Sequence, residues 1–143
     1  ADATVRCVIM CSPVIDPLGR YRYVKQLQAS GTPHPAILDE VLPCHDAYWQ
    51  SEEAMADGCP AIALERGEEL ELPPVLYLQG SEDRVHPRDQ LDRFVAAYRR
   101  AGGVVDLQLF EGEEQGFMVY KAGSPAAHRA NEMIVEFVHK QIR

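Results

Sequence analysis

The stretch from Pro73 to Pro87, PPVLYLQGSEDRVHP, places a continuous apolar run between a pair of prolines and a glycine. Such a run predicts a β-strand that is buried on both faces, as in a parallel sheet covered by helices. The strand is predicted to end at Gly80, where an acidic turn begins, and Pro87 is predicted to start a helix. Functional groups of parallel sheets lie just beyond the carboxyl ends of the strands, which is the position of Asp83. Asp83 is therefore the first candidate functional residue.

Two further segments predict strands of the same sheet. Residues 4–12, TVRCVIMCS, are apolar and partly β-branched. In residues 104–110, VVDLQLF, apolar and polar side chains alternate, which predicts a partly exposed strand. Residues 88–101, and the segment that starts at Ser124 and Pro125, show the apolar spacing of amphipathic helices. Strands that alternate with helices predict an α/β fold with three layers, α/β/α. Its parallel sheet would have about three strong strands, flanked by helices.

Residues 20–72 show no single strong periodicity, and we expect an irregular, helical, cap-like segment over the edge of the sheet. Short helices are expected within it, at residues 21–28, 35–41 and 51–57, the last with Ser51 as its N-cap. The proline-punctuated residues 12–19 are expected to form a loop. A length of 143 residues suits one domain with a real core, so residues 1–143 are predicted to form a single, partial domain.

The strand around Val5 to Cys11 is too apolar on both faces to be a free edge of a sheet. An uncovered apolar edge invites pairing with another chain. We therefore expect another polypeptide segment, or a second copy of this chain, to pair with this strand.

The charge and hydropathy exclude some partners. A formal net charge of −8 disfavours nucleic acid, because phosphate binding needs clustered Lys and Arg. No apolar run reaches the roughly 18 to 20 residues of a membrane span, and no signal-peptide pattern is present. We expect no membrane partner and a cytoplasmic location. The sequence begins with Ala, which would fit a processed or excised chain.

The cysteines do not indicate a metal site. Cys7, Cys11, Cys44 and Cys59 lack the CxxC pairs of zinc sites; the local cluster Cys44-His45-Asp46 has side chains that could ligate a metal, but its spacing disfavours this interpretation. We expect reduced, structural cysteines, with Cys7 and Cys11 buried on the same side of their strand. No metal and no organic cofactor is predicted.

Three segments together resemble the carboxyl-terminal half of an α/β-hydrolase-fold protein of the esterase, lipase and dipeptidyl-peptidase-like kind. Residues 12–17, SPVIDP, resemble the loop after the sixth strand, and PPVLYLQGSEDRVHP resembles the seventh strand with its acid loop. The run LQLFEGEEQGF resembles the eighth strand and the loop around the catalytic histidine. The resemblance implies that Asp83 holds the position of the triad acid, which orients a histidine base.

The chain departs from that family at two places. The family carries its nucleophile in a G-x-S-x-G elbow, and none of the five serines has this setting. Gln115 occupies the position expected for the histidine, and an amide cannot take up and return a proton near neutral pH. Three readings of Gln115 remain open: a degenerate enzyme that binds without turnover, an active branch whose base lies elsewhere, or a substitution in a fragment.

Other residues are candidates for the site. His86 follows Asp83 by three positions and is an alternative base, although a cap or loop role at the start of a helix explains it more simply. Four large side chains are candidates for the wall of an acyl or aromatic pocket, although such residues more often belong to the core: Tyr48, Trp49, Phe117 and Met118.

Two functional hypotheses follow. In the first, the chain is part of a carboxylic ester hydrolase that works through an acyl-serine once a partner segment supplies the elbow. In the second, it is a non-catalytic binding or assembly module, a pseudo-hydrolase, with Gln115 in place of the histidine. Both imply a small acyl, ester or aromatic ligand. A flavodoxin-like domain is a remoter alternative, because no glycine-rich phosphate loop follows the first strand.

Overall fold

The computed structural model describes residues 4–142, which fall into two compact units. The first, called the sheet unit, comprises residues 4–13, 71–83 and 98–142. The second, called the helical unit, comprises residues 14–70 and 84–97. Each unit is described by itself.

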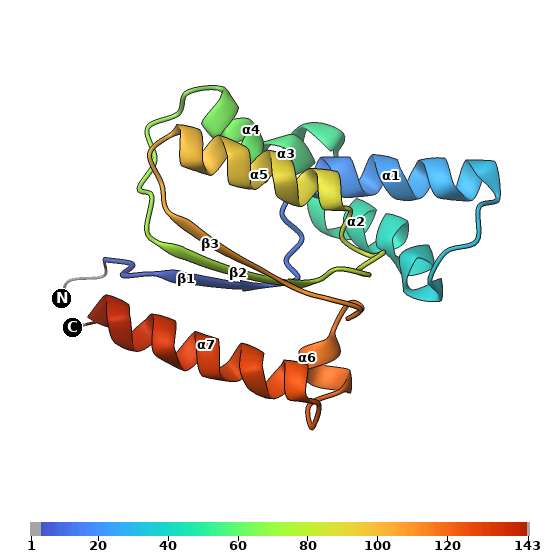
Figure 1. The fold of residues 1–143 in the computed structure, drawn as a ribbon. Coiled ribbons are helices and arrows are strands. Elements are labelled where there is room, and N and C mark those ends of the chain that lie inside the picture. Colours follow the sequence, from blue (N-terminus) through green and yellow to red (C-terminus); the bar gives the residue numbers. More distant parts are fainter. Residues whose placement is uncertain (1–3, 143) are drawn as a thin grey trace. The chain divides into compact units, whose positions relative to one another are not determined.

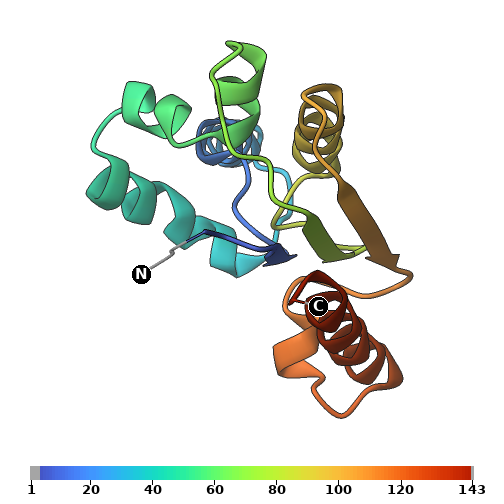
Figure 2. The same ribbon diagram turned by 90° about the vertical axis from the view of Figure 1, so that its left-hand side faces the viewer.

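The sheet unit contains three parallel strands in the order β1-β2-β3, namely β1 (Val8–Cys11), β2 (Val75–Gly80) and β3 (Val105–Phe110). Figure 2 shows the three strands side by side. In the register, Val75 of β2 lies opposite Val8 on one side and Val105 on the other. The predicted α/β class, with a parallel sheet flanked in the sequence by helices, is confirmed.

All residues of β2 are buried, as its apolar run predicts. β1 is shorter than predicted, because residues 4–7 form no strand. The pairing begins where Val8 donates to the carbonyl of Pro74. Pro73 and Pro74 have no N–H with which to continue the ladder toward the amino terminus, so the earlier residues of the first segment remain unpaired with β2.

Helix α7 (Pro125–Ile142) runs along one face of the sheet, with the short helix α6 (Phe117–Tyr120) before it (Figure 1). The predicted cap of α7 is confirmed, because the Ser124 hydroxyl accepts a hydrogen bond from the Ala127 amide at 3.2 Å. Leu76 and Leu78 of β2 share a buried core with Phe117 and with Ala130 of α7. The small side chain of Ala130 suits close packing of the helix on the strand.

The helical unit contains α1 (Pro17–Ser30), the 3₁₀ helix η1 (Ala36–Glu40), α2 (Val41–Trp49), α3 (Glu52–Asp57), α4 (Pro60–Glu65) and most of α5 (Arg88–Arg100). Ser51 caps α3 as predicted, accepting from the Ala54 amide at 3.1 Å. Its small core consists of Val24, Leu38, Val41 and Val85. The helical character of the middle segment is confirmed. Its role as a cap, and the single-domain organisation of the chain, stay predictions.

Several local predictions were wrong. The loop predicted for residues 12–19 ends early, because Asp16 accepts from the Gly19 amide at 2.7 Å and starts α1 at Pro17. Helices α2 and α4 were missed. Their prolines, Pro43 and Pro60, lie in the first turn, where the missing N–H has no helical partner to lose. Cys11 is exposed, and Cys7 lies outside β1, so the predicted buried pair does not form.

Among residues 4–142, no helix is long and apolar enough to cross a membrane.

Candidate functional site

The loops that follow β2 and β3 are joined by backbone hydrogen bonds. The Ser81 amide donates to the Phe110 carbonyl at 2.9 Å, and the Glu82 amide donates to the Glu113 carbonyl at 3.0 Å. The Ser81 hydroxyl accepts from the Gly112 amide at 2.9 Å. These bonds fix the acid loop, residues 81–83, against the loop that carries Gln115.

Gly80 lets the two loops approach each other. A Cβ at position 80 would overlap the backbone carbonyl of Glu113 and would lie 3.0 Å from the Glu114 carbonyl oxygen. Backbone on that side cannot turn away as a flexible side chain can, so glycine is required for close approach.

Asp83 lies just beyond β2 and is only 9% exposed. Its amide donates to the Gly80 carbonyl at 3.3 Å, which closes a tight turn. Burial, and then the negative charge of Asp83, raise the pKa of Tyr77, so this tyrosine stays protonated. The structure therefore places a carboxylate at the carboxyl end of the central strand, as the sequence predicts.

Gln115 lines a small pocket at the carboxyl ends of β1 and β2. The pocket has a volume of about 150 Å³, and its walls, which define the Gln115 pocket, are Cys11, Ser12, Leu78, Gln115, Gly116, Phe117, Met118 and Val119. Phe117 is almost fully buried and also belongs to the core of the sheet unit. The structure thus brings together three predicted site residues, Gln115, Phe117 and Met118.

Three residues of this pocket, Cys11, Ser12 and Leu78, were missed as site residues. Ser12 has a φ of 45°, in the left-handed region that non-glycine residues rarely adopt, and its amide donates to the Leu78 carbonyl at 2.8 Å. Partial burial raises the pKa of the Cys11 thiol. The signal that the sequence offered was position, because Cys11 and Ser12 end a predicted strand just as Asp83 follows one.

The other predicted site residues belong to the helical unit. Tyr48 is 77% exposed and meets Trp49 edge-on, with ring centroids 4.9 Å apart. The Trp49 ring packs over Gly58, where a Cβ would overlap it. His86 is buried. The roles of Tyr48, Trp49 and His86 stay predictions.

His45, which the sequence analysis considered as part of the Cys44-His45-Asp46 cluster, is a buried histidine in α2. It is 7% exposed, stacks on Tyr21 with centroids 6.1 Å apart, and its Nε2 has no hydrogen-bond partner in the described part of the chain. Burial, and then the positive charge of Arg20, lower the pKa of His45. Burial therefore disfavours the charged form of this imidazole in the folded helical unit.

Two observations concern metals and alternative cavities. Within residues 4–142, no group of three or more His, Cys, Asp or Glu side chains is placed to hold a metal ion.

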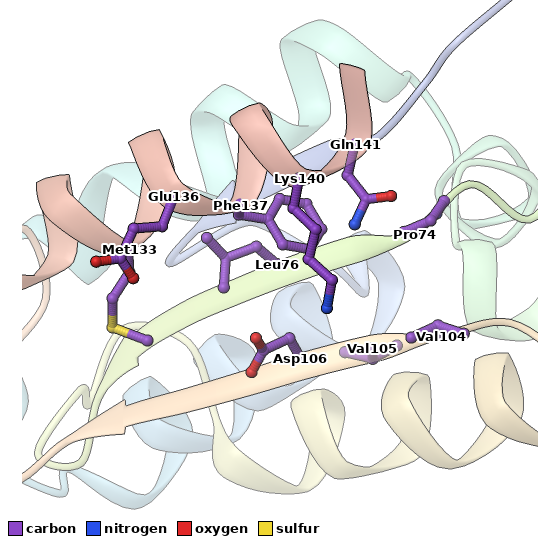
Figure 3. A pocket seen from close by; sticks show the side chains of 10 residues that line it. All are labelled: Pro74, Leu76, Val104, Val105, Asp106, Met133, Glu136, Phe137, Lys140 and Gln141. Carbon is purple, nitrogen blue, oxygen red and sulfur yellow. The ribbon is translucent and has the colours of Figure 1, made fainter. Parts of the chain in front are cut away.

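A groove of about 490 Å³, larger than the Gln115 pocket, is called the α7–β3 groove. It is lined by Pro74, Leu76, Val104, Val105, Asp106, Met133, Glu136, Phe137, Lys140 and Gln141 (Figure 3). It lies at the amino-terminal ends of β2 and β3, whereas parallel sheets bind ligands at the carboxyl ends.

Comparisons with known proteins define the fold. No protein-family model matches, and no curated protein matches. The structure of the esterase EstE5, soaked with p-nitrophenyl butyrate, is similar to 95% of this chain, with 18% identity and a TM-score of 0.69. The chain has part of an α/β-hydrolase fold. Est2, a thermophilic esterase from the Planctomycetes species Thermogutta terrifontis with propionate bound, matches 98% of the chain at 19% identity and a TM-score of 0.63.

The matched region is only part of each hydrolase. The chain spans 43% of EstE5 and 46% of Est2. Puromycin hydrolase matches 82% of the chain at 28% identity and a TM-score of 0.57, and the match covers 16% of that protein. The expectation of a partial α/β-hydrolase fold is therefore confirmed.

Proposed function

We propose that this partial hydrolase fold binds a short acyl ester in the Gln115 pocket and does not turn it over through a serine triad. The observation that carries the proposal is the position of Gln115, an amide in a small pocket at the carboxyl end of the sheet. In the resembling family this position holds the base. An amide donates and accepts hydrogen bonds but does not take the proton of a serine hydroxyl.

The volume and walls of the pocket select the ligand. A cavity of about 150 Å³ takes a molecule of benzene size, which corresponds to a propionyl or butyryl group. Leu78, Phe117 and Met118 supply apolar walls for such a chain. Gln115 and Ser12 supply donors for a carbonyl oxygen. Among the similar structures, Est2 has propionate bound and EstE5 was soaked with p-nitrophenyl butyrate, and both small molecules carry short acyl groups.

The charge of the walls favours a neutral ligand. The residues that line the pocket include no Lys and no Arg, and the chain carries a net charge of −8. A free carboxylate would enter without a cation to offset its desolvation. We therefore expect methyl butyrate to bind more tightly than butyrate.

The test is a titration of the 143-residue chain with methyl butyrate, followed by amide chemical shifts. Gln115→Leu keeps the approximate size of the side chain but removes its hydrogen bond, and we expect roughly 2- to 10-fold weaker binding, which equals about 0.5–1.5 kcal/mol. Gln108→Leu is the control, because Gln108 is an amide of the same unit that bonds to Asp106 of its own strand, outside the pocket. Equal affinity of the Gln115→Leu variant and the parent chain, or no saturable shifts, would contradict the proposal.

A second candidate function is favoured by Asp83, which is retained and buried at the end of β2. In this case, polypeptide outside the chain supplies the serine and a base. The serine oxygen bonds to the acyl carbon, the base moves the serine proton to the departing alcohol, and water then releases the acid. Labelling of the assembled material by a fluorophosphonate would favour this enzyme, whereas retained ester binding without label favours the binding module.

A further inference from the structure

The helical unit has a pocket of its own, which α1 and α5 line and which we call the α1–α5 pocket. Its volume of about 340 Å³ lies within the usual range of small-molecule sites. The walls include Arg22, Tyr23 and Gln26 of α1 and Asp89, Gln90 and Arg93 of α5. All the residues that line it belong to the helical unit, so the pocket is formed within one compact unit.

Gln90 is the residue of this pocket that points to a ligand. It is only 8% exposed, and its side chain forms no hydrogen bond with another described residue. A buried amide normally finds partners for its N–H donors and its carbonyl oxygen, because an unmatched group costs stability. The amide is not fully enclosed by protein, so it reaches the pocket that Gln90 lines. Its hydrogen-bond partners are therefore solvent or a ligand in that pocket.

The charged groups of the pocket compensate one another. The charges on its walls come from two arginines and two aspartates: Arg22, Arg93, Asp16 and Asp89. Both guanidinium groups already have carboxylate partners. Arg93 donates to Asp16 at 3.2 Å and to Glu65 at 2.8 Å, and Arg22 donates to Glu52 at 2.8 Å. An anionic ligand would compete with these carboxylates, and a cationic ligand would meet both guanidinium groups, so the pocket favours a neutral ligand.

We propose that the α1–α5 pocket binds a neutral pyranose sugar. A sugar hydroxyl both donates and accepts hydrogen bonds, and so do the amides of Gln26 and Gln90. The Asp89 carboxylate accepts, and within the described part of the chain its side chain has no partner. Tyr23 offers the apolar surface of its ring to the C–H groups of the sugar. The proposal is independent of ester binding in the Gln115 pocket, which belongs to the sheet unit.

Sugars that share one ring but differ in charge test the proposal. The 143-residue chain is titrated with D-glucose, D-galactose and D-mannose, followed by the side-chain NH₂ signals of Gln90 and the amide of Gly19, which also lines the pocket. We expect saturable shifts with at least one of them, with a Kd on the order of 1 mM for a ligand of this size. The cationic D-glucosamine and the anionic D-glucuronate should bind at least about threefold more weakly.

A free sugar and the sugar end of a glycoconjugate share this chemistry. The methyl glycoside of the sugar that binds distinguishes them, because its anomeric oxygen is substituted as in a glycoconjugate. Equal binding of the methyl glycoside would identify an attached sugar as a ligand, and loss of binding would restrict the pocket to free sugars.

Three variants locate the ligand. Gln90→Leu should weaken binding roughly 3- to 10-fold without lowering the free energy of unfolding, because the buried amide has no protein partner to lose. Gln26→Ala, at an exposed position of α1, should weaken binding roughly 2- to 5-fold. Gln28→Ala is the matched control, because Gln28 lies on the same helix and donates to Asp39 outside the pocket, and its affinity should equal that of the parent chain.

Three results would overturn the proposal. The first is the absence of saturable shifts with all three neutral sugars. The second is a charged sugar that binds as tightly as the neutral ones. The third is equal affinity of the Gln26→Ala, Gln90→Leu and Gln28→Ala variants, which would place any bound sugar elsewhere.

Discussion

Replacement of Gly80 by alanine should separate the two loops that form the candidate site. A Cβ at this position would overlap the Glu113 carbonyl, and the backbone must shift to relieve the overlap. Overpacking of this kind destabilises by about 1–3 kcal/mol. Weakening of the bonds from Ser81 to Phe110 and from Glu82 to Glu113 adds about 0.5–1.5 kcal/mol each. We expect a total loss of roughly 2–6 kcal/mol in the free energy of unfolding.

Thermal unfolding followed by circular dichroism measures this loss. At about 3 °C per kcal/mol for a chain of this size, Gly80→Ala should lower Tm by roughly 6–18 °C. The Ser81 and Glu82 amides should also lose protection against exchange. Gly123→Ala is the control, because Gly123 has an ordinary φ and open space around its Cβ position, and its Tm should change by no more than about 3 °C. If Gly80→Ala unfolds like the control, the close approach of the loops does not exist in solution.

Two further predictions concern stability. The pKa of His45 is lowered by burial, so its neutral form stabilises the folded state fully above the unfolded pKa of about 6.5, and stability falls by up to about 1.4 kcal/mol per unit as pH drops below that value toward the folded pKa. Denaturant unfolding at pH 7.5 and 5.5 should show this loss of stability, and the His45→Leu variant should no longer show it. The variant should keep the opposite pH trend of His34, whose pKa is raised by its hydrogen bond to Asp39. If His45→Leu leaves the pH dependence of stability unchanged, the effect does not come from His45. Ser124→Ala removes the N-cap of α7 and should lower the free energy of unfolding by about 0.5–2 kcal/mol, as measured by denaturant unfolding. The control Ser30→Ala, at the end of α1, should lower it by less. Equal losses in the two variants would argue against the cap.

The sequence was most informative where local chemistry alone determines an element. The prolines before Val75 and the glycine at position 80 bound β2, and Ser124 with Pro125 starts α7. In both cases the backbone rule acts within a few residues. The resemblance of the Asp83 and Gln115 loops to a hydrolase was also specific enough to predict the fold.

The remainder depended on contacts that are distant in the sequence. Residues 4–12 were predicted as a strand, but β1 comprises only Val8–Cys11, because Pro73 and Pro74, more than sixty positions away, cannot continue the ladder. Ser12, which lines the Gln115 pocket, has a left-handed conformation that no sequence pattern around this serine indicates. Asp16 caps the start of α1 through a side-chain hydrogen bond to the Gly19 amide, but the neighbouring prolines led to the prediction of a loop there.

The central claim, that a short ester occupies the Gln115 pocket, can be tested through methionine methyl groups. Met118 lines the Gln115 pocket and Met133 lines the α7–β3 groove, so each methyl reports on one cavity. With methyl-labelled methionine and methyl butyrate, we expect intermolecular nuclear Overhauser effects from the butyryl chain to the Met118 methyl, and an ester that stays intact. Effects to Met133 instead, or to neither methyl, would contradict the account.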